Sequence, residues 1–201
     1  MNIPPTARVE PLAPDDPRSQ DPRLEELVAF VGYRPHALLT MARKPGVLTA
    51  LLDLVGHTLR GPGLIEPGLR FLLGAEACRG ARCAYSTVHA VHAAQHAGID
   101  WARLSALPDY RNDDRFDARE RAALAIASAG ATLPVADAGP AFEAAKHYFC
   151  EDELIEIVSV VALFGWFNRW NSLLRTTLEP VPAEALHHVG WLEQLMKEYT
   201  T

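Results

Sequence analysis

The sequence predicts an all-α fold, and three observations support this prediction. Apolar residues recur at intervals of three and four in several segments, as they do on one face of a helix. No segment alternates apolar and polar residues as a half-buried strand would. Proline, glycine and aspartate stand at positions typical of helix starts and ends. With 201 residues, 49% of them hydrophobic, the chain is long enough to form one domain with a substantial core.

The first predicted helix begins at Pro22. Asp21 is its N-cap, proline suits the first helical position, and Gly32 ends the helix. Residues 1–22 contain six prolines and several acids, a composition that does not form a helix. We therefore predict an extended N-terminal arm over residues 1–22 and a single helical domain over residues 23–201.

Proline and glycine delimit the helices that follow. The predicted segments are Ala37–Arg43, Val47–Leu59, Pro67–Gly80, an Ala-rich helix from Cys83 to Gly98, 117–129, Ala141–Phe149, Leu154–Leu174 and Ala183–Tyr199. Loops are expected around Pro108 and over residues 130–140. Leu154–Leu174 is apolar on nearly every side, so it should be the central buried helix. Asn168 and Arg169 within it should be anchored to a neighbouring helix or subunit, or Arg169 should face a substrate.

The stretch from Glu76 to Gly98 holds most of the candidate chemistry, with two of the three cysteines and three of the eight histidines. Cys83 stands at the start of a helix, where unpaired N–H groups and the helix dipole favour a thiolate, and Arg82 acts in the same direction. A thiolate is the nucleophile that redox chemistry needs. The same helix face also carries Ser86, His89, His92 and His96, with Tyr85 near its edge.

The segment Cys83–His89, read as CAYSTVH, resembles the C-x-Y-C-x-x-H motif of the carboxymuconolactone decarboxylase and alkylhydroperoxidase D superfamily. Gly63–Arg70 is similar to the lead into that motif. Phe167–Asn171, followed by Thr177–Pro180, is similar to the F-N-R-W-N…L-E-P segment of the longer, peroxidase-related members. The resemblance covers roughly residues 34–182. It implies an alkylhydroperoxidase D-like helical bundle that assembles as a homo-oligomer, a dimer or larger.

The resemblance also implies a function, a peroxidase-like thiol oxidoreductase with an antioxidant role. Cys83 would be its attacking thiolate and His89 a proton donor or acceptor, with Tyr85 and Ser86 as polar neighbours. Ser86 stands where the family has its second cysteine, so the C-x-x-C disulfide cannot form and the enzyme should be degenerate. That chemistry needs no cofactor.

Two further positions depart from the family pattern. The proton-relay glutamate that the family implies falls at Phe71, and the position often held by the relay histidine is Ala90. Glu76 is therefore a candidate substitute for the glutamate. Cys78 is either a substitute partner for Cys83 across Gly80 or a buried structural cysteine.

Other readings of the same residues remain open. His89, His92 and His96 permit a metal site, but three ligands along one helix diverge, and we expect no metal. A lyase or isomerase like carboxymuconolactone decarboxylase would use His89 or His92 as an acid or base on a small carboxylate. A non-catalytic, ligand-binding member is the third class. Cys150 is expected to have no redox role.

Composition excludes several classes of function. The net charge is −6 and no long basic block occurs, so nucleic-acid binding is not expected. The longest apolar run, Ile157–Phe167, is too short for a membrane span. The first residues lack the apolar core of a signal peptide, and the odd number of cysteines argues against a disulfide scaffold. We expect a cytoplasmic protein that acts on a small molecule, a peroxide or a small carboxylate.

Overall fold

The computed structural model describes residues 7–135 and 137–200, and these residues form helices, turns and loops without a strand. The all-α prediction is confirmed. The helices are α1 (Pro22–Val31), α2 (His36–Met41), α3 (Val47–Val55), α4 (Pro67–Gly80), α5 (Ala84–His96), α6 (Trp101–Ala106), α7 (Ala118–Gly130), α8 (Gly139–Ala145), α9 (Glu151–Leu174), α10 (Pro180–Ala183), α11 (Ala185–His188) and α12 (Gly190–Thr200). A π-helical turn, Gly56–Arg60, extends α3, and 3-10 turns cover Pro17–Ser19 and Leu107–Asp109.

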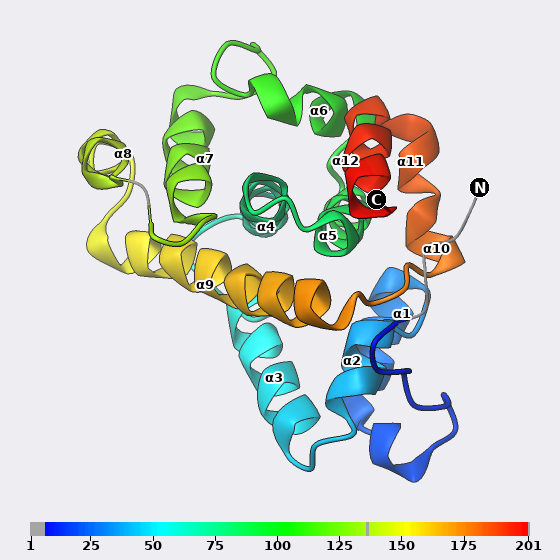
Figure 1. Cartoon of the computed structure of the whole chain (residues 1–201). Coiled ribbons are helices and arrows are strands. Elements are labelled where there is room, and N and C mark those ends of the chain that lie inside the picture. Colours follow the sequence, from blue (N-terminus) through cyan, green and yellow to red (C-terminus); the bar gives the residue numbers. More distant parts are fainter. Residues whose placement is uncertain (1–6, 136, 201) are drawn as a thin grey trace.

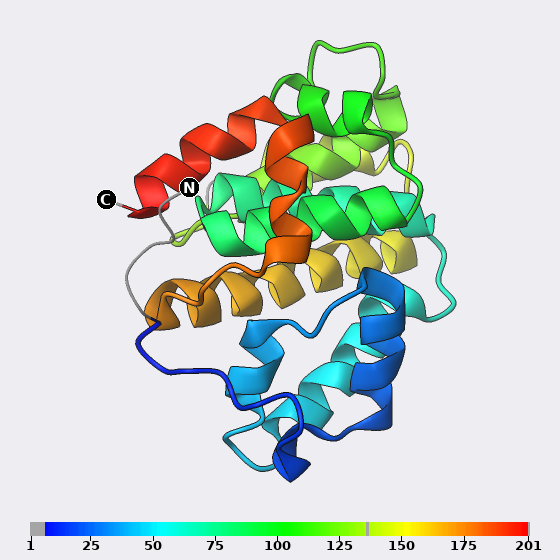
Figure 2. The same ribbon diagram turned by 90° about the vertical axis from the view of Figure 1, so that its right-hand side faces the viewer.

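Helix α9 crosses the middle of the molecule and separates two groups of helices (Figure 1). On one side α4 packs against α5, α7 and α9, while α2 and α3 lie on the other side. The second view agrees with this arrangement (Figure 2). After α9 the chain turns back, and α10, α11 and α12 all contact α5. The N-terminal part of α5 is thus enclosed by segments that are far apart in the sequence.

Helix α9 is central, as predicted, but it is not buried on every side. Leu154, Ile157 and Val160 face the core, whereas Ile155 is 65% exposed and Leu173 is 67% exposed. The residues of α9 that face solvent are nevertheless largely apolar. An apolar stripe on a surface helix is unusual enough to need an explanation.

Local chemistry explains the helix starts that the sequence predicted. The Asp21 side chain accepts a hydrogen bond from the backbone N–H of Arg23, and Gly32 ends α1 with a φ of 85°. At α7, Asp117 and Glu120 form a reciprocal capping box. These contacts satisfy backbone groups that have no partner within the helix.

The break between α4 and α5 has a different cause from the one that the sequence suggested. Gly80 is still helical, and a Cβ there would lie 2.6 Å from the Cβ of Ala131, so glycine permits close packing. The residue that takes a left-handed conformation is Arg82, with a φ of 54°. Cys83 follows as the N-cap of α5.

Two predicted elements were wrong. Residues 101–106 form α6 within the predicted loop, and the predicted last helix is divided into α11 and α12, with α10 before them. The arm is extended over most of its described part, but Leu12 is buried and Arg8 donates its backbone N–H to the carbonyl of Leu174. Residues 1–6 of the predicted arm lie outside the described residues. In the described part of the chain, no helix is both long and apolar enough to cross a membrane.

Candidate active site

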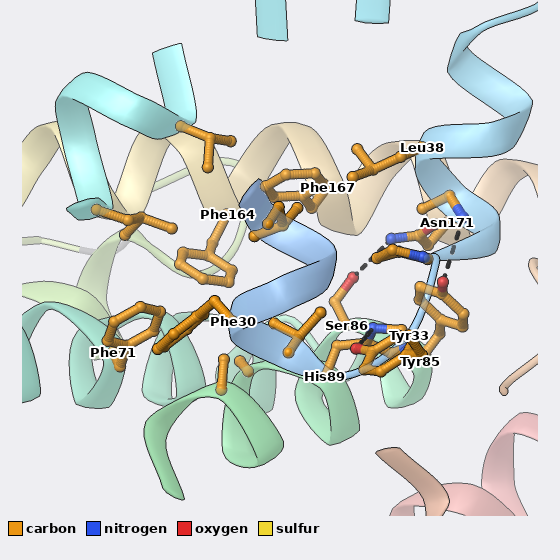
Figure 3. A pocket seen from close by; sticks show the side chains of 18 of the residues that line it. Phe30, Tyr33, Leu38, Phe71, Tyr85, Ser86, His89, Phe164, Phe167 and Asn171 are labelled. Carbon is orange, nitrogen blue, oxygen red and sulfur yellow. Dashed lines mark hydrogen bonds between the residues drawn. The ribbon is translucent and has the colours of Figure 1, made fainter. Parts of the chain in front are cut away.

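A cavity of about 110 Å³ lies where α1, α2, α4, α5 and α9 meet. Most of its wall is apolar, with the rings of Phe30, Phe71, Phe164 and Phe167 along one part (Figure 3). Polar side chains gather at the other end. They are Tyr33, Tyr85, Ser86, His89 and Asn171. A mostly apolar cavity with a few convergent polar groups is the usual form of a small-molecule site.

His89 is held between a carboxylate and a phenol. Its Nε2 lies 2.8 Å from Oε2 of Glu179, and its Nδ1 lies 2.6 Å from the hydroxyl of Tyr33. A carboxylate only accepts hydrogen bonds, so Nε2 carries a proton, and in the neutral ring Nδ1 accepts from Tyr33. The geometry therefore fixes the tautomer of His89 and gives it a carboxylate partner.

Glu179 is the N-cap residue of α10 and is buried. Burial alone would raise its pKa, but His89 and the backbone N–H of His36 outweigh burial and hold the pKa of this carboxyl below its usual value. Its Oε1 also accepts a hydrogen bond of 2.9 Å from the hydroxyl of Tyr85. Glu179 is therefore a buried carboxylate whose charge is satisfied by several donors.

The two tyrosines remain donors because their ionisation is disfavoured. Burial, and then the negative charge of Glu179, raise the pKa of both Tyr33 and Tyr85 well above the ordinary value. The ring of Tyr85 stacks on His89, with ring centroids 4.0 Å apart. The Tyr85 hydroxyl also accepts from the backbone N–H of Ala37 at 3.2 Å, which links α2 to the site.

Cys83 and Ser86 lie together at the start of α5. The thiol of Cys83 is 1% exposed and donates a hydrogen bond to Oγ of Ser86 over 3.2 Å. The amide Nδ2 of Asn171 donates to the same oxygen at 3.0 Å. Ser86 lines the cavity, and Cys83 is not among the lining residues. With both lone pairs of Ser86 engaged, its own proton can be donated elsewhere.

The other two residues expected to help Cys83 point away from it. The exposed guanidinium of Arg82 pairs with Glu198 on α12 rather than lying over the thiol. Glu76 is fully buried, and both of its carboxylate oxygens accept from Arg79 at 2.7 Å. Glu76 does not line the cavity. The structure thus brings together Cys83, Tyr85, Ser86 and His89, but not Glu76.

All three cysteines are free. Cys78 is fully buried, and burial raises the pKa of its thiol well above the usual value. Cys150 is exposed and is the N-cap residue of α9. Neither cysteine lines the cavity, so Cys83 is the thiol nearest to it through Ser86.

The three histidines of α5 do not converge. His89 faces Glu179, Nε2 of His92 lies 2.9 Å from the carbonyl of Val31, and Nδ1 of His96 lies 3.1 Å from the carbonyl of His92. Over residues 7–135 and 137–200, no group of three or more His, Cys, Asp or Glu side chains is arranged to hold a metal ion.

Solved structures with this fold include the debrominase Bmp8. A cysteine-to-alanine variant of Bmp8 in complex with 2,3,4-tribromopyrrole is 26% identical to this chain, with a TM-score of 0.82 over 89% of this chain and 95% of that one. The chain has the alkylhydroperoxidase D-like fold. A peroxidase-related protein with an alkylhydroperoxidase AhpD core, from Ralstonia eutropha JMP134, shares the fold at 20% identity and a TM-score of 0.76, covering 89% and 95% of the two chains.

A peroxidase-related protein from Silicibacter sp. TM1040 also has this fold, at 21% identity and a TM-score of 0.70, covering 86% of this chain and 95% of that one. No protein-family model matches the sequence, and no curated protein matches it. The likeness to these proteins therefore rests on the three-dimensional structure.

Several site residues of this alkylhydroperoxidase D-like chain were missed by sequence reasoning. Glu179 and Asn171 lie in segments already noted for their resemblance to the family, but nothing in those segments indicates which side chains they contact. Glu179 is 90 positions from His89, and only the fold brings them together. Tyr33 follows Gly32 in a short connection that carries no motif. An acidic residue before Pro180 was a visible signal, although it equally indicates an ordinary helix cap.

Proposed function

We propose that this protein is a thiol oxidoreductase that reduces a small, largely apolar organic hydroperoxide with Cys83 as its single reactive thiol. One observation carries the proposal. Ser86 joins Cys83 by a hydrogen bond of 3.2 Å to a cavity that also contains the His89–Glu179 pair. A nucleophile, a proton-transfer group and a substrate-sized space are thereby contiguous.

The cavity wall supports an apolar substrate. Phe30, Phe71 and Phe164 offer aromatic faces to an organic group, and the polar end offers hydrogen bonds to an oxygen function. In this arrangement the organic part of a hydroperoxide lies among the rings. Its O–O bond then faces Ser86 and Tyr33.

The proposed reaction balances without a cofactor. The thiolate of Cys83 attacks the terminal oxygen of the hydroperoxide, the S–O bond forms and the O–O bond breaks. The sulfur is oxidised to a sulfenic acid, and the hydroperoxide is reduced to an alkoxide, which departs. The proton that the thiol releases ends on this alkoxide. Tyr33 and His89 act as the acid–base pair for that transfer, and Glu179 stabilises the protonated imidazole.

Reduction of the sulfenic acid requires an external thiol. Ser86 supplies no resolving sulfur, and Cys78 is fully buried with a raised pKa. One equivalent of a small thiol displaces water to form a mixed disulfide with Cys83. A second equivalent releases the free cysteine. The cytoplasm contains such thiols, and we propose that compartment for the protein.

A second candidate is reductive dehalogenation of an aromatic ring. Two observations favour it, the aromatic wall of the cavity and the 26% identity to a debrominase. In this reaction the thiolate of Cys83 takes the halogen as a sulfenyl halide, and the carbanion left on the ring takes a proton from the Tyr33–His89 pair. An external thiol then releases halide and forms a mixed disulfide, which a second thiol reduces.

Turnover with dithiothreitol as reductant tests both candidates. The natural protein should reduce cumene hydroperoxide, or release bromide from a bromopyrrole, and Cys83→Ser should abolish this activity. Cys150→Ser is the matched control and should retain it, since Cys150 is exposed and away from the cavity. Equal background rates in all three folded proteins would overturn the proposal. They would favour a histidine-based lyase or a ligand-binding protein.

A further inference from the structure

One face of α9 is left uncovered by the rest of the described chain. Exposed or half-buried residues recur on it at alternating intervals of four and three. They are Glu151, Ile155, Val158, Ala162, Gly165, Arg169 and Ser172. This alternation is the seam by which one long helix packs against another. We call these seven residues the α9 seam.

Five of the seven seam residues, from Val158 to Ser172, line one wall of a surface groove. Residues 130–133, Val135, Ala138 and Phe142 form much of the opposite wall, and the groove has a volume of about 910 Å³. Its apolar side chains include Leu133, which is 65% exposed, and Val135, which is 53% exposed. At its floor the buried Oδ1 of Asn168 has no hydrogen-bond partner in the described part of the chain. This acceptor is available to a donor from outside the described chain.

The seams of two copies are complementary when the two α9 helices run antiparallel. If the two helices run antiparallel, with Glu151 of one copy opposite Arg169 of the other, then Ile155 lies opposite Gly165 and Val158 opposite Ala162. Each layer pairs either opposite charges or a larger apolar side chain with a smaller residue. We propose that α9 is the contact between two copies of this chain, in this antiparallel register.

Charge supports this register. Glu151 and Arg169 are both exposed, and neither makes an ion pair with another residue in the part of the chain that the structure describes. They are 18 positions apart on one helix, about 27 Å at the helical rise, so they cannot pair within one copy. In the antiparallel pair, the twofold symmetry produces two such ion pairs.

Size supports the same register. A Cβ added at Gly165 would meet nothing within 4 Å, so the backbone is open to a neighbour there. The Ile155 side chain is 65% exposed, so the rest of the described chain leaves most of it uncovered. In the proposed contact the isoleucine of each copy fills the space above the glycine of the other. The inference does not depend on the proposed enzymatic activity.

Charge reversal tests the pairing, with mass measured by light scattering during gel filtration at micromolar concentration. The natural protein should have the mass of two copies or an even multiple. Arg169→Glu and Glu151→Arg should each weaken association at least tenfold, because each places like charges opposite each other. The double variant should restore it. Lys44→Glu is the matched control for Arg169→Glu, since it changes the net charge by the same amount at an exposed position off the seam.

Gly165→Leu provides a second test that does not compromise the fold. The added side chain meets open space within one copy, so the melting temperature of the isolated subunit should not fall. The mass should nevertheless fall by half, because Ile155 of the other copy loses its space. The proposal would be overturned if the natural protein were monomeric or if the single variants associated as strongly as it does. It would also be overturned if the double variant associated as weakly as the single variants.

Discussion

At the scale of the residue, Ser86 determines what Cys83 can do. Its Oγ accepts hydrogen bonds from the thiol and from Asn171, and it lies between the thiol and the cavity. Once Cys83 ionises, the same hydroxyl can reverse its role and donate to the thiolate. A serine can therefore stabilise the attacking sulfur, but it cannot resolve the oxidised product.

Replacing Ser86 with cysteine should restore the missing resolving thiol. The pair would lie three positions apart at a helix start, so an intramolecular attack on the sulfenic acid replaces a bimolecular one, and turnover limited by that step should rise at least about tenfold. Asn171 loses a strong acceptor, at a cost of about 1 kcal/mol of unfolding free energy. Peroxide consumption with a dithiol reductant measures the gain, and Cys83→Ser in the same background should remove it.

Two cavity-lining positions extend this series. Phe71 and Ala90 stand where the family implies acid–base groups, and both face the cavity. Adding Phe71→Glu and Ala90→His to Ser86→Cys should raise turnover further if proton transfer limits it. An unchanged rate across the whole folded series would contradict the peroxidase proposal.

Glu179→Gln tests the role of the buried carboxylate. Glutamine can still accept from Tyr85, but it removes the negative charge beside His89. We expect kcat to fall about a hundredfold, at the lower end of general acid–base contributions, with KM little changed. Glu184→Gln, an exposed acid five positions away, should leave kcat unaltered. A proportional loss in both variants would exclude a specific role for Glu179.

At the scale of the element, the contact between α4 and α9 sets the shape of the cavity. A Cβ on Gly74 would lie 2.2 Å from Cε2 of Phe164, so the two helices approach closely only because this residue is glycine. Phe164 lines the cavity from α9, and its ring position depends on this contact.

Gly74→Ala should therefore both destabilise the protein and alter the cavity. The methyl group overpacks the contact, at a cost of about 1–3 kcal/mol of unfolding free energy, and it displaces the Phe164 ring. Chemical denaturation measures the first effect, and affinity for an apolar substrate measures the second. Gly56→Ala is the control. It meets open space in a helical conformation and should be neutral or stabilising by up to about 1 kcal/mol.

The link between α5 and α1 should make stability depend on pH. Burial is the main cause that lowers the pKa of His92, whose Nε2 bonds to the carbonyl of Val31. The unfolded chain therefore binds a proton at higher pH than the folded one. The contribution of His92 to the free energy of unfolding is therefore fully present above about pH 6.5 and is lost as the pH falls below that value. The loss is no more than about 1.4 kcal/mol per pH unit.

Thermal melting between pH 7.5 and pH 5.5 measures this dependence. His92→Gln should lose less stability over that interval than the natural protein does. His57→Gln replaces an exposed histidine and should behave like the natural protein. If His92→Gln kept the full pH dependence, another group would be responsible.

Helix starts could be predicted from the sequence because their causes are local. Asp21, Pro22 and Asp117 act on backbone groups within a few positions of themselves. The cluster of Cys83, Ser86 and His89 was predictable for the same reason, since helical spacing alone puts these residues on one face. The positions of Glu76 and Arg82 could not be predicted from the sequence, because each side chain pairs with a residue other than Cys83. Glu76 pairs with Arg79, and Arg82 pairs with Glu198.

At the scale of the whole molecule, the site is assembled from segments that are distant in the sequence. Tyr33 comes from the connection after α1, His89 from α5, Asn171 from α9 and Glu179 from the start of α10. Sequence spacing carries no information about such contacts. The alkylhydroperoxidase D-like fold provides them, and the side chains at these positions determine what chemistry the site can support.

The most direct test of the central claim is the oxidation state of each cysteine during turnover. The protein is mixed with one equivalent of cumene hydroperoxide and trapped with dimedone, and the fraction of each cysteine labelled is measured by peptide mass spectrometry. Cys83 should be labelled nearly completely, and dithiothreitol added before dimedone should prevent the labelling, while Cys78 and Cys150 stay unlabelled. An unmodified Cys83 while peroxide is consumed would contradict the account.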